Sequence, residues 1–268
     1  MTAALEDFFG QPVVEAAAHR DAAAYVADLL NALEGGTARA ATQHQGQWTP
    51  QPWVKHGILT AFRLSSLVEM DWPGGAVDKD LIPARDFSLS DGVRVVPGGT
   101  SVRRGAHVAS SVVVMPPSYV NIGGYVGANS MVDSHVLVGS CAQVGTGVHL
   151  SAAVQLGGVL EPIGARPVIV EDDAFIGAQC GLYEGVVVGA GAVLAPGVML
   201  TASSTIFDLV NEREVRGEVP AGAVVVPGSR PASGAFAQQH GLSLYAPMIV
   251  KYRDDRTDAA TLLENALR

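Results

Sequence analysis

The chain has 268 residues, with 17 Lys and Arg against 26 Asp and Glu, so its formal net charge is −9. Charged residues make up 16% of the chain and aromatic residues 6%, while glycine occurs 31 times. Since globular proteins carry about 25% charged residues, this is a glycine- and aliphatic-rich chain, unlike a disordered or coiled-coil one. The acidic balance argues against nonspecific binding of nucleic acid.

Two cysteines, Cys141 and Cys180, are too few for a disulfide scaffold or a Cys-rich zinc site. Residues 1–8 are acidic and lack the basic and apolar stretches of a secretory signal. No uninterrupted apolar run reaches the roughly 18 residues of a membrane helix, because glycines and Pro196 interrupt 186–200. We therefore expect a soluble, cytoplasmic protein that binds neither nucleic acid nor membrane.

Residues 1–95 are expected to form a mainly helical N-terminal domain. Apolar residues recur at helical spacing over 16–33, and Gly35 with the glycine after it caps that helix. A second amphipathic helix is expected over 53–67. Pro73 and the two glycines after it end this region.

The strongest signal is an aliphatic residue at every sixth position of the following segment. The first run is Val102, Val108, Val114, Val120, Val126, Val132, Val138, Val144, Leu150 and Leu156. After a short insertion come Val170, Ile176, Leu182, Val188, Leu194, Leu200 and Ile206, and then Val219 and Val225. Glycine often follows the aliphatic residue directly, where we expect it to supply a positive φ.

A period of six does not fit a helix of 3.6 residues per turn, but it fits a short strand followed by a tight turn. Because one such unit cannot bury its aliphatic residue alone, stacked copies must share a core. The pattern predicts a parallel β-helix over 96–228. An ordinary β-sandwich with chance spacing is the alternative, and ten residues in unbroken register argue against it.

A small C-terminal extension is expected over 229–268. Residues 228–241 resemble a loop, 243–252 a strand, and 258–267 a closing helix.

Several strings are more specific than the period. They are Arg94-Val-Val-Pro97, Pro117-Ser-Tyr-Val-Asn-Ile-Gly123, Met131-Val-Asp133, Val138-Gly-Ser-Cys-Ala-Gln143, Val148-His-Leu-Ser151, Gly157-Gly-Val-Leu-Glu-Pro162 and Val170-Glu-Asp172. With Gly46-Gln-Trp48, Ser243-Leu-Tyr245 and Ile249-Val-Lys251, they resemble the tetrahydrodipicolinate N-succinyltransferase family over nearly the whole chain, in order.

This resemblance implies a mainly β, left-handed parallel β-helix that assembles as a homotrimer, with acyl-CoA lying in a groove between subunits. It implies transfer of a succinyl group from succinyl-CoA to the amino group of opened 2-amino-6-oxopimelate in lysine and diaminopimelate synthesis. Neither a metal nor a permanently bound cofactor is implied. The substrate-contacting Arg and Asp of the family match Arg94 and Asp133.

Asp133 follows the core position Val132, where neighbouring repeats often place glycine. As a functional residue it would hold the incoming ammonium and take its proton, because amine attack on a thioester requires a free lone pair. The alternative is a turn aspartate that tolerates a positive φ. The Met-Val-Asp match favours the functional interpretation.

Arg94 is expected to bind a substrate carboxylate, since a fixed guanidinium suits bidentate contact. Its alternative is a surface ion pair with Asp86 or Asp91.

Gly157 and Gly158 lie where the period breaks, and their amides are candidates to line the thioester of the acyl-CoA; a plain turn is the alternative. Arg230, Lys251 or Arg253 are candidates to bind the CoA phosphates, although any one of them alone is more simply explained as a solvated cation.

The chain departs from the family at Phe175-Ile-Gly-Ala-Gln-Cys-Gly-Leu-Tyr-Glu184-Gly185, where the family typically has F-I-G-A-R-S-E-V-V-E-G. Gln179 replaces the family's Arg, and Gly181 replaces its first Glu, an expected acid or substrate contact. Glu184 keeps the second Glu and is a candidate catalytic acid. Losing one cation and one carboxylate favours a changed acceptor.

Two assignments within one class stay open: the lysine-pathway N-succinyltransferase, and a relative that succinylates or acetylates a different amine. A Cys/His mechanism is not favoured, because direct transfer from CoA needs no covalent enzyme intermediate, Cys141 and Cys180 fit small packing positions, and His149 is expected to be solvated. A zinc-dependent or purely structural β-helix is a third interpretation, but His107, His135 and His149 form no ligand motif.

Overall fold

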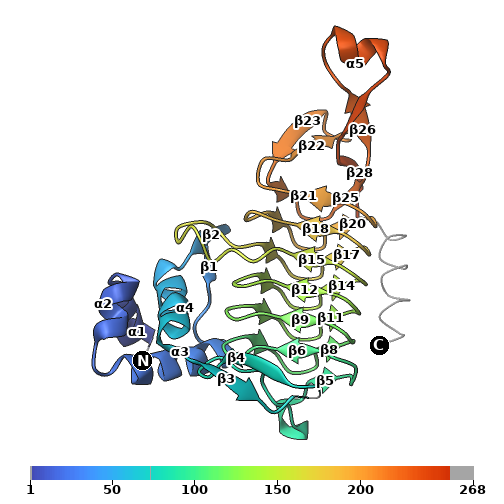
Figure 1. The fold of residues 1–268 in the computed structure, drawn as a ribbon. Coiled ribbons are helices and arrows are strands. Elements are labelled where there is room, and N and C mark those ends of the chain that lie inside the picture. The colour runs from blue at the N-terminus through green and yellow to red at the C-terminus, as the bar shows by residue number, and fades with distance from the viewer. Residues whose placement is uncertain (1, 73, 254–268) are drawn as a thin grey trace.

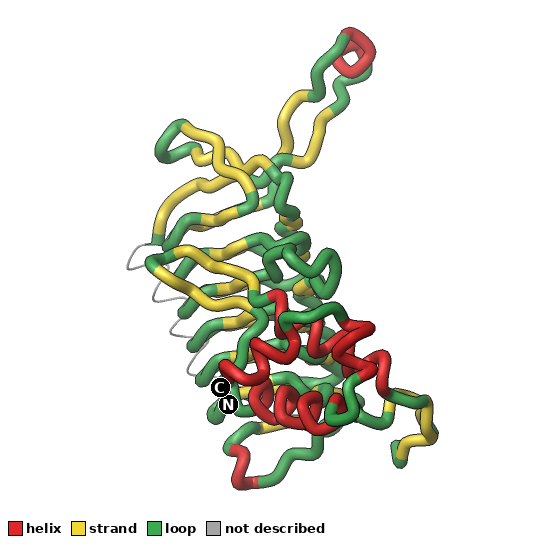
Figure 2. Tube along the Cα trace, turned by 90° about the vertical axis from the view of Figure 1, so that its left-hand side faces the viewer, coloured by secondary structure: helices red, strands yellow, loops and turns green. Residues whose placement is uncertain are grey.

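The computed structural model describes residues 2–72 and 74–253. A three-sided β-helix forms the body of the molecule, with a helical N-terminal domain on one flank and a projecting C-terminal arm (Figures 1 and 2). None of the helices in these residues is both long and apolar enough to cross a membrane.

The N-terminal domain is built from helices that pack around one apolar core. They are α1 (Thr2–Phe9), α2 (Val13–Ala18), α3 (Ala22–Glu34) and α4 (Pro52–Leu64). Phe9, Leu29 and Ile58 are fully buried where these helices meet. The chain also forms two β-hairpins here. The hairpin of β1 (Ala41–His44) and β2 (Gln47–Pro50) lies between α3 and α4, and that of β3 (Leu67–Met70) and β4 (Ala76–Lys79) follows α4.

The prediction of one continuous helix over 16–33 is wrong. The helix is broken at 19–21, where His19 has an extended backbone and its Nδ1 accepts a hydrogen bond from the Asp21 amide. The second helix begins at Pro52, whose missing N–H costs nothing in the first turn, and ends earlier than expected, at Leu64.

The β-helix consists of three parallel sheets that follow one another along the chain. Face 1 contains β7 (His107–Val108), β10 (Tyr125–Val126), β13 (Gln143–Val144), β16 (Ile169–Val170), β19 (Val187–Val188) and β24 (Glu218–Val219). Face 2 contains β5 (Arg94–Val95), β8 (Val113–Val114), β11 (Met131–Val132), β14 (His149–Leu150), β17 (Phe175–Ile176), β20 (Val193–Leu194) and β25 (Ala223–Val226). Face 3 contains β6 (Ser101–Val102), β9 (Tyr119–Val120), β12 (Leu137–Val138), β15 (Gln155–Leu156), β18 (Gly181–Leu182) and β21 (Met199–Leu200).

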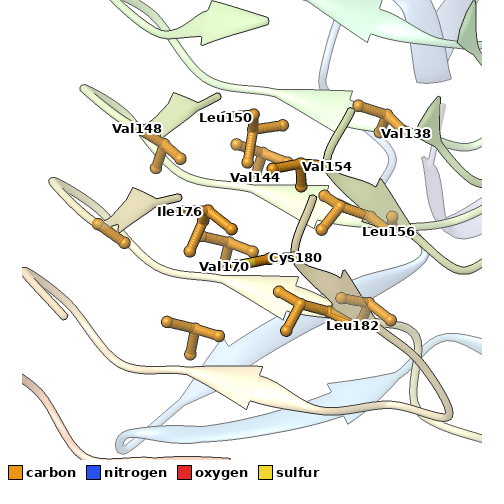
Figure 3. Close-up of a cluster of buried hydrophobic side chains, with 14 of the residues drawn as sticks. Val138, Val144, Val148, Leu150, Val154, Leu156, Val170, Ile176, Cys180 and Leu182 are labelled. Atoms are coloured by element: carbon orange, nitrogen blue, oxygen red, sulfur yellow. The ribbon is translucent and has the colours of Figure 1, made fainter. Parts of the chain in front are cut away.

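Three hexapeptides make one coil, because Val126 pairs with Val108 in the coil before it and with Val144 in the coil after it. In each two-residue strand the second residue points inward. These residues, with the small residues and valines of the corners, form one continuous buried core in which Leu150 and Ile176 have no exposed surface (Figure 3). Burial of this shared column is what stabilises each coil.

The corners contradict the expected role of glycine. The positive φ lies three residues after the inward aliphatic residue, as at His135 (63°) after Val132, and not directly after it. Glycine directly after the aliphatic residue serves close packing instead, since a Cβ on Gly127 would lie 2.6 Å from the backbone of Gly145 in the next coil. The spacing of coils therefore selects this glycine.

The N-terminal domain packs on face 1 and on the corner between faces 3 and 1. The Arg39 guanidinium stacks on Tyr125 at 3.8 Å, and Trp48 Nε1 donates to Glu171 Oε1 at 2.7 Å. The insertion at 157–168 joins this contact, because the buried Lys55 Nζ donates to the Ala165 carbonyl at 2.6 Å.

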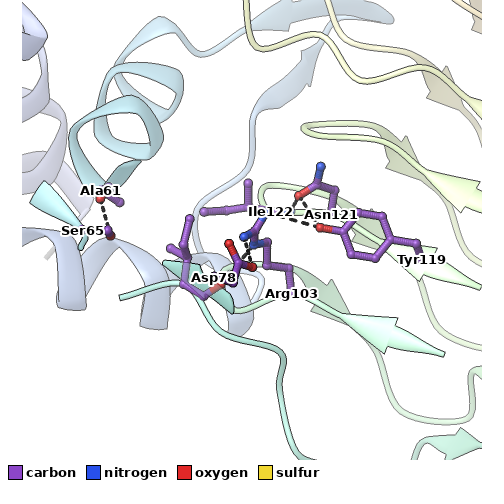
Figure 4. A network of polar contacts seen from close by, with 8 residues as sticks. Ala61, Ser65, Asp78, Arg103, Tyr119, Asn121 and Ile122 are labelled. Carbon is purple, nitrogen blue, oxygen red and sulfur yellow. Dashed lines mark hydrogen bonds and ion pairs between the residues drawn. The ribbon is translucent and has the colours of Figure 1, made fainter. Parts of the chain in front are cut away.

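Polar contacts hold the β3–β4 hairpin against the first coils of face 3. Arg103 forms an ion pair with Asp78 (Figure 4). It also donates to the Ile82 carbonyl at 3.0 Å. On the neighbouring strand, the Tyr119 hydroxyl donates to Asn121 Oδ1 at 3.2 Å. The described start of the β-helix, at β5, lies just before the expected division at 95 and 96.

The C-terminal segment differs from the expected loop and strand. A hairpin arm of β26 (Ser229–Pro231) and β27 (Ser243–Tyr245) projects from the body and carries α5 (Ala235–Gln239) at its tip (Figure 1). The expected strand 243–252 is two strands, β27 and β28 (Met248–Tyr252). β28 closes the core with Ile249, and the expected helix 258–267 lies outside the described residues.

A buried carboxylate organises the cap at this end of the core. Asp208 on β22 (Thr205–Asp208) accepts hydrogen bonds from Asn211, from the Tyr252 hydroxyl at 2.8 Å and from Arg213 on β23 (Arg213–Arg216) at 3.2 Å. Burial alone would raise the pKa of Asp208, but these hydrogen bonds outweigh it and hold the pKa well below its usual range.

A carboxylate with a depressed pKa stabilises the fold above its unfolded-state pKa and loses that effect as the pH falls through its folded-state pKa. We therefore expect Asp208→Asn to lower the denaturant midpoint at pH 7, and the gap to wild type to narrow at pH 3. Urea unfolding at both pH values measures this, with the exposed Asp21→Asn as control. A gap that is equal at both pH values would contradict the role assigned to the charge.

Candidate active site

Asp133 is held at the corner between faces 2 and 3, which we call the 2–3 corner and which comprises 133–136, 151–154 and 177–180. Its backbone N–H donates to the Leu150 carbonyl at 2.9 Å, and its carbonyl accepts from Ser118 Oγ at 2.7 Å. Carboxylate Oδ1 accepts from the Ser134 amide at 2.7 Å. Asp133 is half-buried, and Oδ2 accepts no hydrogen bond from residues 2–72 and 74–253, so the side chain is oriented with one oxygen available.

The alternative explanation of Asp133 as a positive-φ turn residue is wrong. The left-handed position of this corner belongs to His135. A carboxylate that a fixed backbone holds at a corner of the β-helix can accept a proton from a nucleophile bound at that corner.

Arg94 lies on the outward row of face 2, below Val113 and Met131. It is exposed, and within the described ranges it forms no ion pair with Asp86 or Asp91, so that alternative is wrong. Asp91 is instead bound by the Ser88 amide at 2.7 Å. Two strand spacings, about 9–10 Å, separate Arg94 from the Met131 strand that precedes Asp133.

Gln179 lies on the same corner as Asp133, two coils further along. The amide of Ala153 donates to the Ser134 carbonyl, and the amide of Gln179 donates to the Ala152 carbonyl, so these turns stack directly. The coil between them has the small residues Ser151, Ala152 and Ala153 at the corner. A strip of small residues thus lies between Asp133 and Gln179, whose coils are about 9–10 Å apart and which stand two positions apart along the corner.

Gly181 begins strand β18 on face 3, and the Tyr183 side chain covers it. A Cβ added to Gly181 would lie 2.6 Å from Met199 Sδ and 2.7 Å from Tyr183 Cε2. A glutamate at this position would therefore clash with Tyr183 as it is placed. This contact was not expected from the sequence; the available signal was an aromatic residue two positions after an unusual glycine.

Glu184 lies at the corner between faces 3 and 1, where it is exposed and has a φ of 56°. Asp133 and Glu184 therefore occupy different corners of one chain. Within a single chain the structure groups Asp133 with Gln179, and not with Glu184.

Gly157 and Gly158 lie at the start of the insertion, and their amides differ. The Gly157 amide donates to the Leu182 carbonyl at 2.8 Å as part of the coil ladder, so it is not available to an oxyanion. Gly158 is exposed, and in the described part of the chain its amide donates no backbone hydrogen bond. Of the two amides, only that of Gly158 is left available to a ligand by these backbone hydrogen bonds.

Arg230 and Lys251 both lie toward the C-terminal end. Arg230 is exposed on the arm, where it pairs with Leu244, and Lys251 is half-buried on β28 beside Val224. Lys251 continues the outward row of face 2, five strand spacings or about 24 Å from Met131.

His107 and His149 pack against the β-helix as structural residues, whereas His135 is exposed at a corner. His149 is 5% exposed and stacks on Phe175 at 4.8 Å, so the expectation that it is solvated is wrong. His107 stacks on Tyr125, and its Nδ1 lies 2.7 Å from the Glu34 carbonyl. Among the described residues, no three His, Cys, Asp or Glu side chains converge in a way that could hold a metal ion.

Comparisons with known proteins place the chain in a family. Residues 3–64 match the model of the tetrahydrodipicolinate N-succinyltransferase N-terminal domain, and 167–202 match the hexapeptide repeat of succinyl-transferase. A 2,3,4,5-tetrahydropyridine-2,6-dicarboxylate N-succinyltransferase of Parvibaculum lavamentivorans is 43% identical over 91% of this chain and 89% of its own. That of Afipia carboxidovorans is 44% identical over 93% and 90%.

The solved structures to which the chain is similar include a putative N-succinyltransferase from Campylobacter jejuni. The two chains are 15% identical, the match covers 82% of this chain and 61% of that chain, and the TM-score is 0.43. The repeat and the relatives define a hexapeptide-repeat transferase with a left-handed β-helix, which confirms the expected fold class. The chain belongs to the tetrahydrodipicolinate N-succinyltransferase family, as the resemblance indicated.

The two thiols are unsuited to a covalent mechanism. Burial raises the pKa of Cys141 to about 12 and that of Cys180 to about 11, so both stay protonated at neutral pH. We expect the folded protein to react with the thiol reagent DTNB at pH 8 only slowly, and both thiols to react at once in guanidinium chloride. Rapid labelling of the folded protein with parallel loss of activity would contradict this.

Proposed function

We propose that the protein is an acyl-CoA-dependent N-acyltransferase that uses succinyl-CoA or another acyl-CoA, with Asp133 as the base or amine anchor. The observation that carries this is the Asp133 carboxylate, which the Ser134 amide orients while one oxygen stays available at the edge of the β-helix. Family membership at 43–44% identity over nine-tenths of the chain supports the class of reaction.

The proposed reaction is direct transfer. The amine nitrogen attacks the thioester carbonyl carbon, and Asp133 takes a proton from that nitrogen. The C–S bond then breaks, an amide remains, and the CoA sulfur leaves as a thiolate that takes up a proton. The Gly158 amide is proposed to donate to the oxygen that becomes negative during attack, and Arg94 to bind a carboxylate of the acceptor.

Lys251 and Arg230 are proposed to bind the phosphates of CoA. The row from Met131 to Lys251 measures about 24 Å, a span comparable with an extended CoA, if the thioester lies near Asp133. A homotrimer with a groove between subunits, and a cytoplasmic location, are proposed from the family resemblance. In such a trimer, Glu184 of one subunit is proposed to approach Asp133 of another, since the two lie on different corners of one chain.

Two acceptors are candidates. The family's acceptor is supported by relatives that are named tetrahydropyridine-dicarboxylate N-succinyltransferases. A different amine, acylated outside lysine synthesis, is supported by Gln179 and by Gly181 under Tyr183, which remove a cation and an anion from the region beyond Asp133.

The proposed function is tested by release of the CoA thiol from succinyl-CoA and acetyl-CoA in the presence of a panel of amines. We expect release that depends on the amine, with 2-aminopimelate as the probe of the family acceptor. No release with any amine would contradict acyl transfer. Turnover of 2-aminopimelate at least equal to that of every other amine would contradict the changed-acceptor candidate alone.

Asp133→Asn keeps the shape and the turn hydrogen bond of the side chain but removes the base, so kcat is expected to fall at least roughly tenfold. Asp173→Asn is the matched control, because Asp173 is an exposed turn aspartate on another corner. Unchanged kcat in Asp133→Asn would remove Asp133 from the chemistry.

A further inference from the structure

The Tyr183 ring lies across two glycines of neighbouring coils, Gly157 directly after strand β15 and Gly181 at the start of strand β18. A Cβ on Gly157 would lie 2.7 Å from Tyr183 Cδ1, and a Cβ on Gly181 would lie 2.9 Å from its hydroxyl oxygen. Any other residue at either position would displace the ring. The two glycines and the tyrosine therefore form one unit, in which the ring occupies the space above Gly181.

The strand surface of face 3 that lies beside this ring carries no charged side chain. The outward positions of the face 3 strands share this property; they are Ser101, Tyr119, Leu137, Gln155, Gly181 and Met199. The Met199 sulfur also lies over Gly181, and the Met199 amide donates to the Tyr245 hydroxyl at 2.8 Å. Tyr183 is 37% exposed, and within 2–72 and 74–253 its hydroxyl has no hydrogen-bond partner.

This uncharged surface adjoins the far end of the strip that begins at Asp133. Gly181 follows Gln179 by two residues, so the two positions are at most about 7 Å apart along the chain. An acceptor of pimelate length, with its amine at Asp133 and its body over Ser151–Ala153, would end beside Gln179 and the Tyr183 ring. A carboxylate at that end would lose water without meeting a Lys or Arg side chain of the 2–3 corner or of the outward positions of face 3, which is unfavourable.

We propose that Tyr183 is a specificity-determining residue, which selects an acceptor amine whose far end is uncharged. The inference rests on the proposed acyl transfer and decides between its two acceptor classes. The ring supplies an uncharged wall that ends in a hydroxyl over Gly181, and Gln179, two residues before Gly181, supplies a neutral hydrogen-bonding group. An amine of this length with a methyl or other uncharged terminus fits both, whereas an acceptor with a second carboxylate does not.

The test compares two acceptors of equal length that differ only at the far end, 2-aminoheptanoate and 2-aminopimelate, in the succinyl-CoA thiol-release assay. For the wild-type protein we expect kcat/KM to be at least roughly tenfold higher for 2-aminoheptanoate. In Tyr183→Val that preference is expected to fall roughly tenfold, mainly through a higher KM for 2-aminoheptanoate.

Two further variants separate the ring from its surroundings. Tyr183→Phe keeps the aromatic ring and is expected to keep the preference for 2-aminoheptanoate. The test therefore does not depend on Tyr183→Val alone, should that variant fold poorly. The variant Q179R/G181E/Y183V restores both charges and is expected to shift preference toward 2-aminopimelate. Phe236→Val, an exposed aromatic residue on the arm, is the control and is expected to leave the ratio unchanged.

The outcomes distinguish this inference from the function beneath it. A wild-type preference for 2-aminopimelate, or a preference for 2-aminoheptanoate that Tyr183→Val and Q179R/G181E/Y183V leave unchanged, overturns the role of Tyr183 while acyl transfer stands. Absence of thiol release with either acceptor and with the wider amine panel overturns the acyl transfer, and the inference falls with it.

Discussion

One constraint organises this protein: each hexapeptide must place one aliphatic side chain in a shared interior column. Val126, Val144 and Val170 follow one another on face 1 with no more than 1% of their surface exposed, and the ladder hydrogen bonds keep successive coils in register. Because no coil buries its aliphatic residue alone, register is strongly specified. The remaining residues of each hexapeptide therefore lie on an outward face or at a corner of the β-helix, where they can contact ligands.

The regular part of the fold was predictable because its period repeats a single packing requirement. The exceptions are places where local polar contacts compete with that pattern. The break at 19–21 depends on the His19 ring accepting from a backbone amide, and α5 is a helix with no buried residues, so neither leaves an apolar signal in the sequence. The glycines directly after several of the aliphatic residues are visible in the sequence, but their cause, contact between coils, becomes visible only in three dimensions.

The candidate site divides in the same way. Arg94 and Asp133 were predicted because each belongs to a short sequence motif. The pairing of strands β5, β8 and β11 determines where the two residues lie relative to each other. Tyr183 was not predicted, because its contact with Gly157 joins residues far apart in the chain that only coil stacking brings together. The Gly157 amide was predicted to be available to a ligand, because the sequence does not show which backbone amides form the hydrogen bonds between coils.

The separation of interior from surface explains how such a protein can change its acceptor without changing its fold. Leu182 keeps its place in the core whether its neighbours at 181 and 183 are charged or not, because those side chains lie outside the column. The substitutions are nevertheless coupled to each other, since a Cβ at 181 or at 157 would collide with the Tyr183 ring. A charge restored at 181 alone would meet this ring, so the region is expected to change as a group of residues, and specificity is best probed by combined variants.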